Sequence, residues 1–400
     1  MLSTGPRDIA PVYHLKKSAA RSLWATQSEP PTRGPVQFLT KQVWPWILHY
    51  ASVMLHWRHE FKSYRTGTGI FPISNKSTVA LAADWGTGTI PAYKVANQIR
   101  SLEPRADVTI HMGDVYYSGT EQEYRDWFLG DEDWPRGVQH TFAMNANHEM
   151  YSGGAGYFDT ALDTLKQETS YFCVETDYWR ILGLDSGYYS GIFPLLEKFW
   201  RSKIRLDDHI LQWLKSVVFA DPSDRRPVIA LTHHQPFSAF GPGYGSLGKN
   251  LAPYLDRILL WMWGHEHRFA GYGPVAAGGG AVIRGRCIGH GGMPIELAEP
   301  PKNPQQTNLV FYDDRLDGEL SEIVREPVGY CGFAALHLDG PDLTIDYIDE
   351  NNVLVLREAW NSAGTAPVGS IKASSNELHV VHPHGVGGLV EPTGPAAPTR

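Results

Sequence analysis

The stretch Ser77-Thr78-Val79-Ala80-Leu81-Ala82-Ala83-Asp84-Trp85-Gly86 is an apolar run that ends in an aspartate and a glycine. Its small and β-branched residues over Thr78–Ala83 predict a buried strand. A second apolar run, Val108–Met112, is likewise followed by an aspartate, in Gly113-Asp114. Helical spacing over Tyr93–Leu102 separates the two runs, so this part of the chain predicts a strand–helix–strand unit. The fold class is therefore expected to be α/β.

The same alternation of strands and helices continues along the chain. Further helices are expected over Glu121–Leu129 and Asp207–Phe219. Further strands are expected at Thr141–Ala146, Tyr171–Val174, Trp179–Leu184, Val228–Thr232 and Leu259–Trp263. Beyond them the sequence is rich in strand-like runs, at Ala281–Ile288, Leu309–Tyr312, Phe333–Leu338, Leu343–Ile348 and Val353–Leu356.

Composition divides the chain into four segments. Residues 1–36 are rich in Pro, Ser, Thr and Arg, which predicts an extended or disordered arm. Residues 37–75 form an N-terminal helical segment with a helix at Val43–Lys62, which either packs on the main domain or contacts a membrane surface or a partner. The main domain is expected over residues 76–360. Residues 361–400, rich in Gly, Pro, Ala and Thr, predict a flexible tail.

The net charge and the number of cysteines limit which partners and which cellular compartment are expected for the protein. The formal net charge is −8 over 400 residues, which argues against a nucleic-acid binder, because such proteins are basic. Three scattered cysteines do not make a disulfide framework, and no apolar run of signal-peptide type opens the chain. The sequence contains no run of about 18 apolar residues, so no transmembrane helix is predicted. We therefore expect a cytoplasmic protein.

Carboxylate, amide and imidazole side chains follow five of the predicted strands. In an open α/β sheet, the loops beyond the carboxyl ends of the strands line the ligand crevice. A single aspartate after a strand is more often a helix cap than a ligand, so the case depends on all five positions together. This mixture of oxygen and nitrogen donors suits borderline and hard divalent or trivalent metal ions. The candidate ligands are Asp84, Asp114, Asn147, His233 or His234, His265 and His267.

With these blocks in place, the sequence resembles the calcineurin-like metallophosphoesterases. Their blocks include Gly-Asp, Gly-Asn-His-Glu/Asp, a histidine that ends a strand, and Gly-His-x-His. The corresponding blocks here are Gly113-Asp114, Asn147-His148-Glu149, Thr232-His233-His234 and Gly264-His265-Glu266-His267. The resemblance covers residues 77–270 and implies a four-layer α/β/β/α sandwich of two mixed sheets.

The first block departs from the general pattern of that family. Gly86 stands where most members have a histidine ligand, whereas purple acid phosphatases have Asp-x-Gly there and gain a tyrosine ligand from Gly-Asp-x-x-Tyr. Tyr117 has the spacing of that tyrosine, while Tyr116 is one residue short and is expected to face the pocket or to pack. The chain thus resembles the purple acid phosphatase branch, and a phenolate ligand would favour Fe(III). The alternative is that Tyr117 only packs.

The resemblance implies a pair of metal ions, Fe(III) with Fe, Zn or Mn(II). One ion would be held by Asp84, Tyr117 and His267, the other by Asn147, His233 and His265, with Asp114 bridging the two. His233 is preferred to His234 because it directly follows the apolar run. His148 would contact the substrate phosphate or protonate the leaving oxygen, or else would orient Asn147 from outside the ligand set.

The predicted function is metal-dependent hydrolysis of phosphate esters by a hydroxide held at the dinuclear centre, with His148 and Asp114 as catalytic residues. A small phosphomonoester is favoured as substrate, as for an acid phosphatase. A phosphodiesterase acting on a cyclic nucleotide or similar diester is the first alternative, and a non-catalytic metal-binding scaffold of the same fold is the second. A dinucleotide-binding module is disfavoured, because Pro91 occupies the position of the third glycine in the motif that starts at Gly86.

Overall fold

The computed structural model of the chain describes residues 58–190, 204–293, 295, 300–316, 328–362, 370–373 and 379–380. The predicted arm at 1–36 lies outside these residues, and so does most of the Val43–Lys62 helix. The last residues of that predicted helix, 58–62, are not helical. There the backbone pairs with another part of the chain, since the His59 amide donates to the Gly153 carbonyl oxygen at 2.8 Å.

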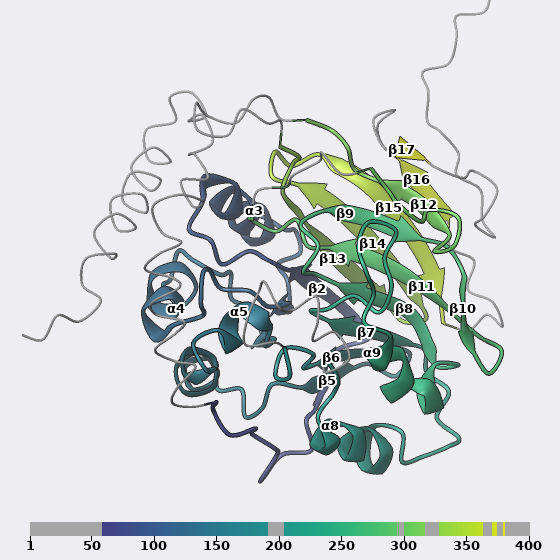
Figure 1. Cartoon of the computed structure of the whole chain (residues 1–400), viewed down its shortest axis with the longest axis horizontal. Coiled ribbons are helices and arrows are strands. Elements are labelled where there is room, and N and C mark those ends of the chain that lie inside the picture. Colours follow the sequence, from purple (N-terminus) through teal and green to yellow (C-terminus); the bar gives the residue numbers. More distant parts are fainter. Residues whose placement is uncertain are drawn as a thin grey trace, which may run out of the picture.

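Two mixed sheets lie face to face in the described part of the chain (Figure 1). The first sheet has the strand order β1-β5-β6-β7-β8-β11-β9-β12-β17, with β10 paired to β11, and the second has the order β16-β15-β14-β13-β2-β3-β4. The strands of the first sheet are β1 (Ile70–Pro72), β5 (Phe172–Glu175), β6 (Arg180–Leu184), β7 (Val228–Thr232), β8 (Ile258–Trp263), β9 (Phe269–Tyr272), β10 (Val275–Gly278), β11 (Ala281–Ile288), β12 (Leu309–Tyr312) and β17 (His379–Val380). Those of the second are β2 (Lys76–Ala82), β3 (Val108–His111), β4 (His140–Ala143), β13 (Gly332–Asp339), β14 (Asp342–Asp349), β15 (Leu354–Asn361) and β16 (Ser370–Ala373).

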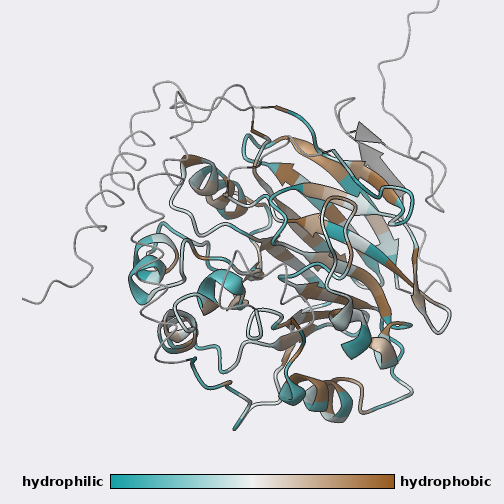
Figure 2. Ribbon diagram, in the orientation of Figure 1, coloured by the Kyte–Doolittle hydropathy of each residue, from teal (hydrophilic) through white to brown (hydrophobic). Residues whose placement is uncertain are grey.

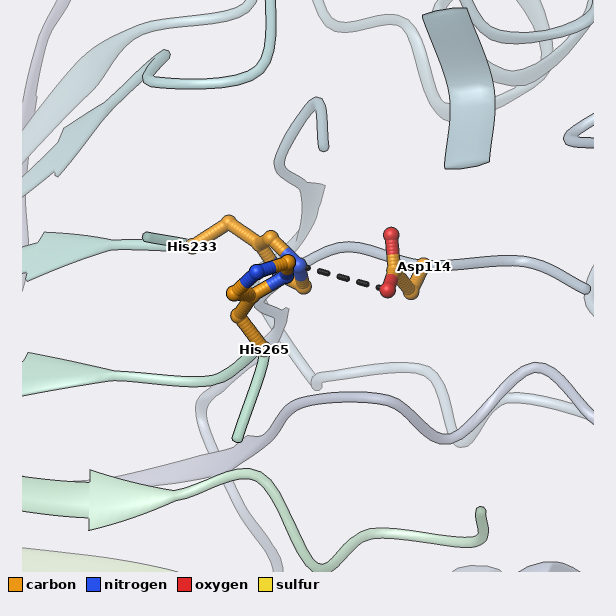
Figure 3. A group of neighbouring side chains, drawn as sticks. All are labelled: Asp114, His233 and His265. Carbon is orange, nitrogen blue, oxygen red and sulfur yellow. Dashed lines mark ion pairs between the residues drawn. The ribbon is translucent and has the colours of Figure 1, made fainter. Parts of the chain in front are cut away.

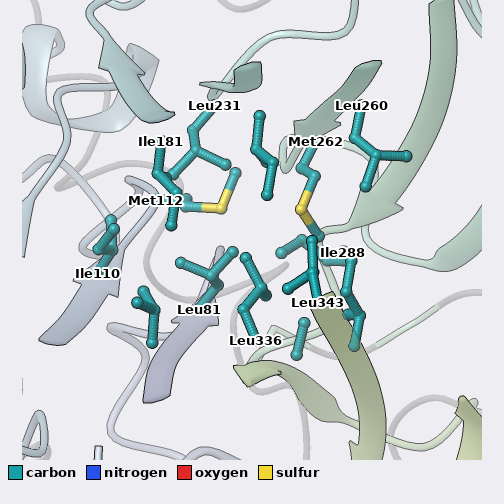
Figure 4. Close-up of a cluster of buried hydrophobic side chains, with 14 of the residues drawn as sticks. Leu81, Ile110, Met112, Ile181, Leu231, Leu260, Met262, Ile288, Leu336 and Leu343 are labelled. Atoms are coloured by element: carbon teal, nitrogen blue, oxygen red, sulfur yellow. The ribbon is translucent and has the colours of Figure 1, made fainter. Parts of the chain in front are cut away.

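The main hydrophobic core fills the space between the sheets. Leu81 and Ile110 from the second sheet meet Leu231 and Met262 from the first, and all four side chains are fully buried (Figure 4). Removing such side chains from water is the main force that holds two sheets together. In Figure 2 the strands in the centre of the molecule are predominantly hydrophobic, in agreement with this core.

Helices cover the outer face of each sheet. On the second sheet, α3 (Ile90–Arg100) and α4 (Glu121–Trp127) bury an apolar cluster that includes Ala80 and Val95. On the first sheet, α8 (Asp208–Trp213) and the π-helical turn η3 (Leu214–Val218) bury another that includes Leu182 and Leu214. The remaining helical elements are α5 (Asn147–Met150), η1 (Gly156–Ala161), α6 (Leu162–Leu165), α9 (Gly245–Asn250) and η4 (Ala252–Tyr254). The predicted α/β/β/α sandwich of two mixed sheets is confirmed.

Both terminal segments contribute strands to this sandwich. Within residues 37–75, β1 pairs in parallel with β5. Within the predicted flexible tail, β16 pairs with β15 and β17 pairs with β12, so these parts of residues 361–400 are ordered by backbone pairing. These two short edge strands were not predicted because the tail has few apolar residues. Their stability comes from pairing with the neighbouring strand. Within the described residues, no helix has both the length and the apolar character to cross a membrane.

Candidate metal centre

The predicted ligands follow strands of both sheets. Asp84 and Asp114 follow β2 and β3, and Asn147 is the first residue of α5, after β4. All three follow strands of the second sheet. The histidines follow strands of the first sheet. His233 comes directly after β7, and His265 and His267 come just after β8. The candidate site therefore lies where the carboxyl ends of strands from both sheets meet.

Asp114 lies at the middle of this group. Its Oδ2 atom is 3.3 Å from Nε2 of His233 and 3.7 Å from Nε2 of His148. One potential ligand atom from each of Asp114, His233 and His265 lies within 4.8 Å of the others (Figure 3). Asp114 and His233 are almost fully buried, at 1% and 0% exposure, so this cluster is enclosed by protein.

Asp84 and His267 lie beside the same aspartate, and Tyr116 connects them. The Tyr116 hydroxyl is 2.9 Å from Oδ1 of Asp84, 3.2 Å from Oδ2 of Asp114 and 3.0 Å from Nε2 of His267. Nε2 of His267 is 3.6 Å from Oδ1 of Asp84. The structure thus brings together an aspartate, a histidine, a tyrosine and the shared Asp114.

The tyrosine at this position is Tyr116, whereas the motif spacing favours Tyr117. Tyr117 contributes its carbonyl oxygen, which lies 2.6 Å from Nδ1 of His148. Gly86 explains the geometry: its carbonyl oxygen accepts from the Tyr116 amide at 2.8 Å, and a Cβ at residue 86 would lie 2.9 Å from Cα of Val115. The close approach that excludes a histidine at residue 86 also places Tyr116. A ligand role for Tyr117 stays a prediction that these contacts do not support.

Asn147 and His148 approach the group from the start of α5. Oδ1 of Asn147 lies 3.1 Å from Nδ1 of His265. The amide of His148 donates to Oδ1 of Asp114 at 3.2 Å, and because its Nδ1 faces the Tyr117 carbonyl, its Nε2 is the ring nitrogen that faces the site. The His148 side chain is 19% exposed, so this edge of the group is reached by solvent.

The two adjacent histidines differ in what they contact. His233 faces Asp114 through Nε2, while its Nδ1 lies 3.0 Å from the Met112 carbonyl oxygen. Nδ1 of His234 lies 3.1 Å from the Ser186 hydroxyl, and its ring centroid is 4.7 Å from that of His265. In the arrangement described, His233 is the one placed to hold an ion together with Asp114, and His234 packs behind His265.

Three of the candidate ligands have left-handed backbone conformations. The φ angles are 58° at Asp84, 70° at Asp114 and 64° at His265. Non-glycine residues rarely adopt such angles, and they persist where the surrounding structure imposes them, often at functional sites. The packing beside two of them is close, since a Cβ on Gly264, the residue before His265, would lie 2.7 Å from Oδ2 of Asp84.

Glu149 supports the site, although no role was predicted for it from its motif. Its carboxylate accepts from the amides of Asp114 and Val115, at 3.3 and 2.8 Å, and from the Tyr124 hydroxyl at 3.0 Å. Burial, together with the negative charge of nearby Asp114, raises the pKa of Glu149 to about 8. Its place in Asn147-His148-Glu149 is the signal that could have identified it. Glu149 fixes the loop that presents Asp114.

The electrostatics of the group call for a cation. Burial raises the pKa of Asp84 well above its usual value, and nearby Asp114 adds to that rise. Burial alone would raise the pKa of Asp114 too, but the imidazoles of His148 and His233 hold it well below its usual value. Burial lowers the pKa of His233, yet Asp114 raises it to about 10. Buried carboxylates with imidazole, amide and phenol donors fit metal ions, which would supply this positive charge.

One protein family and several solved structures are similar to this chain. The family model described as calcineurin-like phosphoesterase matches residues 77–269. No curated protein matches the chain. Among solved structures, purple acid phosphatase PPD1 from yellow lupin seeds is 16% identical with a TM-score of 0.45, covering 73% of this chain and 54% of the lupin chain. A structure of PhoD is 12% identical with a TM-score of 0.47, covering 79% of this chain and 74% of that one. The chain therefore matches about half the length of the lupin protein.

Proposed function

Because residues 77–269 belong to the calcineurin-like phosphoesterase family, we propose that this chain hydrolyses phosphate esters at a dinuclear metal centre around Asp114. The observation that carries the proposal is the buried Asp114 carboxylate, whose Oδ2 atom lies 3.3 Å from Nε2 of His233 and 3.2 Å from the Tyr116 hydroxyl, which also contacts Asp84. A carboxylate shared by two donor groups can bridge two cations and offset their repulsion.

The proposed ligands divide into two groups around this bridge. One group is Asp84, His267 and Tyr116, which lie within 3.6 Å of one another through the contacts given above. The other is Asn147, His233 and His265. Bound metal ions in such a site would polarise a phosphoryl oxygen and lower the pKa of a bound water toward neutrality. We propose Fe(III) with Fe, Zn or Mn(II), because a phenolate is a hard anionic donor.

His148 is the proposed proton donor to the leaving oxygen. Its Nδ1 is fixed by the Tyr117 carbonyl oxygen, which leaves Nε2 facing Asp114 and the substrate side. A histidine held in this way can transfer a proton to a departing alkoxide. The two ring nitrogens thus have separate tasks, orientation for one and proton transfer for the other.

A phosphomonoester is the favoured substrate. The support is the pairing of Gly86 with a tyrosine hydroxyl among the ligands, which is the combination expected of the purple acid phosphatase branch. Purified protein should be analysed for metal content and assayed with an aryl phosphate and a bis-aryl phosphate. Faster turnover of the aryl phosphate supports the monoester, and faster turnover of the bis-aryl compound points to a phosphodiesterase. Two bound metals with no turnover of either would overturn the proposal in favour of a scaffold role.

The compartment stays a prediction. Cys173, Cys287 and Cys331 are free thiols and all are buried. Free thiols fit the expected reducing, cytoplasmic environment, although buried cysteines are inert in either compartment.

A further inference from the structure

Two tyrosine hydroxyls contact the proposed ligands Asn147 and His265 at the atoms that are not placed to hold a metal. The Tyr151 hydroxyl accepts from Nδ2 of Asn147 at 2.8 Å. The Tyr244 hydroxyl lies 3.3 Å from Nε2 of His265. The remaining polar atoms of the two side chains, Oδ1 of Asn147 and Nδ1 of His265, face each other at 3.1 Å. On the basis of the proposed function, we infer that Tyr151 and Tyr244 are positioning residues for one of the two metal ions.

Asn147 needs a partner for its amide nitrogen because only its oxygen can bind a metal ion. The residue is 2% exposed, so water does not supply that partner. A buried N–H group without an acceptor costs about 1–3 kcal/mol. Tyr151 follows α5 directly, one helical turn after Asn147, and its hydroxyl oxygen provides the acceptor. The hydrogen bond therefore keeps Oδ1 directed toward His265.

The two nitrogens of His265 pose a similar choice. If Nδ1 binds the metal, Nε2 carries the proton and needs an acceptor. The Tyr244 hydroxyl can accept from Nε2, and it can donate to Nε2 when the proton is on Nδ1. Tyr244 is 4% exposed and its ring lies 5.0 Å from that of His234, so packing holds the hydroxyl in place. Partners of this kind outside the ligand set fix the orientation of metal ligands.

Both tyrosines act on the same half of the site. Asn147 and His265 belong to one proposed ligand group, whereas Tyr116 contacts Asp84 and His267 in the other. Loss of either hydroxyl should therefore lower the affinity of the protein for one metal ion and leave its affinity for the second unchanged. A purely structural role for the rings would not distinguish between the two ions.

The test uses Tyr151→Phe and Tyr244→Phe, which remove the hydroxyl and keep the ring. Full-length protein is loaded with metal, and its content is measured during titration with a chelator. We expect each variant to lose one metal ion at about 10- to 100-fold lower chelator concentration, with the second ion held as in the wild type. Tyr157→Phe is the matched control, because Tyr157 is also buried and its hydroxyl donates to the Ala143 carbonyl at 2.8 Å, away from the ligands.

The outcomes separate this inference from the proposed function. If the wild type holds two metal ions and both variants release them as the wild type does, the inference is overturned and the proposed function stands. If the affinity for both ions falls equally in the two variants and in Tyr157→Phe, the effect is on folding and the inference is again overturned. A wild-type chain that binds no metal overturns both. Should Tyr151→Phe fail to fold, Tyr244→Phe alone decides the question by the same criteria.

Discussion

The hydroxyl of Tyr116 lies 2.9 Å from Oδ1 of Asp84, although the two residues follow different strands of the second sheet. The parallel pairing of β2 with β3 and the bridge between Gly86 and Val115 bring these strand ends together. In the metal-free protein, burial raises the pKa of Tyr116 well above its usual value, and the two aspartates raise it further. A bound cation would have the opposite effect, because it favours the phenolate.

A tyrosinate bound to Fe(III) absorbs visible light, so Tyr116 can be tested directly. We expect the iron-loaded wild type to be coloured, and Tyr116→Phe to lose the band together with most of its iron affinity. Tyr117→Phe is the matched control and should keep the band, since Tyr117 meets the site through its carbonyl oxygen. Loss of the band in Tyr117→Phe alone would instead restore the ligand that the motif spacing favours.

Asp114 and Asn147 are expected to be indispensable for turnover. Asp114→Asn removes the charge of the proposed bridge, and Asn147→Ala removes the oxygen that faces His265 at 3.1 Å. Both variants should lose detectable hydrolysis of an aryl phosphate, and metal analysis should show reduced loading. Wild-type activity in Asn147→Ala would contradict the assignment of this group of residues as the active site.

His148 should affect turnover more than metal content. Its side chain is partly exposed at the edge of the site and is no part of either proposed ligand group. We expect His148→Ala to lower kcat by about 100- to 10,000-fold, the range typical of a lost general acid, while metal loading stays near that of the wild type. A substrate with a good leaving group, such as a nitrophenyl ester, should show the smaller loss. Equal losses for good and poor leaving groups would argue that His148 only orients Asn147.

His111 should make the stability of the metal-free protein sensitive to acid. Both of its ring nitrogens are buried without a hydrogen-bond partner among the described residues, between the rings of Phe128 and Trp134. Burial lowers the pKa of His111 to about 3, whereas a histidine in the unfolded chain titrates near about 6.5. Between these values the unfolded state binds more protons, so the stability falls as the pH decreases.

Replacing His111 by an apolar ring should therefore remove part of this pH dependence. Urea unfolding at pH 7.5 and pH 5, with a chelator present, should show a smaller difference in stability for His111→Phe than for the wild type. An unchanged difference would mean that other groups are responsible. Surface-exposed His209 provides the control substitution, His209→Phe, because its side chain is 61% exposed.

Breaking a buried ion pair between the two sheets should destabilise the fold strongly. Arg286 in β11 and Glu358 in β15 are joined by contacts of 2.6 Å from Nε to Oε1 and 3.0 Å from Nη2 to Oε2, and both are almost fully buried. Glu358→Gln leaves a buried guanidinium without a counter-charge, which costs about 3–5 kcal/mol of stability. The exposed pair of Lys76 and Asp339 is the control, and Asp339→Asn should cost less than about 1 kcal/mol by the same denaturant measurement.

Much of the fold was predictable because its strands are long apolar runs. The predicted strands Val228–Thr232 and Ala281–Ile288 coincide with β7 and β11. Edge strands such as β16 were missed, because their residues are held by pairing with a neighbour and carry little apolar signal of their own. For the candidate site, the sequence predicted which strands the ligands follow and which residue types stand there.

The choice between adjacent residues was harder to predict than the position of the site. Spacing in the motif favours Tyr117, but the close contact of Gly86 with Val115 directs the hydroxyl of Tyr116 to Asp84. Glu149 was visible in the sequence only as part of a motif, and its role depends on which backbone amides it reaches. Such details depend on three-dimensional packing, which a linear pattern does not contain.

The origin of the ligands in two separate sheets has a consequence for proteolytic resistance. An unfolded chain has no ligand group, so a metal ion that binds the native centre raises the free energy of unfolding by about 1.4 kcal/mol for each tenfold excess over its Kd. Withdrawal of metal would then increase the fraction of molecules that open between the sheets and expose cleavable backbone. The supply of metal would thus set the lifetime of the protein as well as its activity.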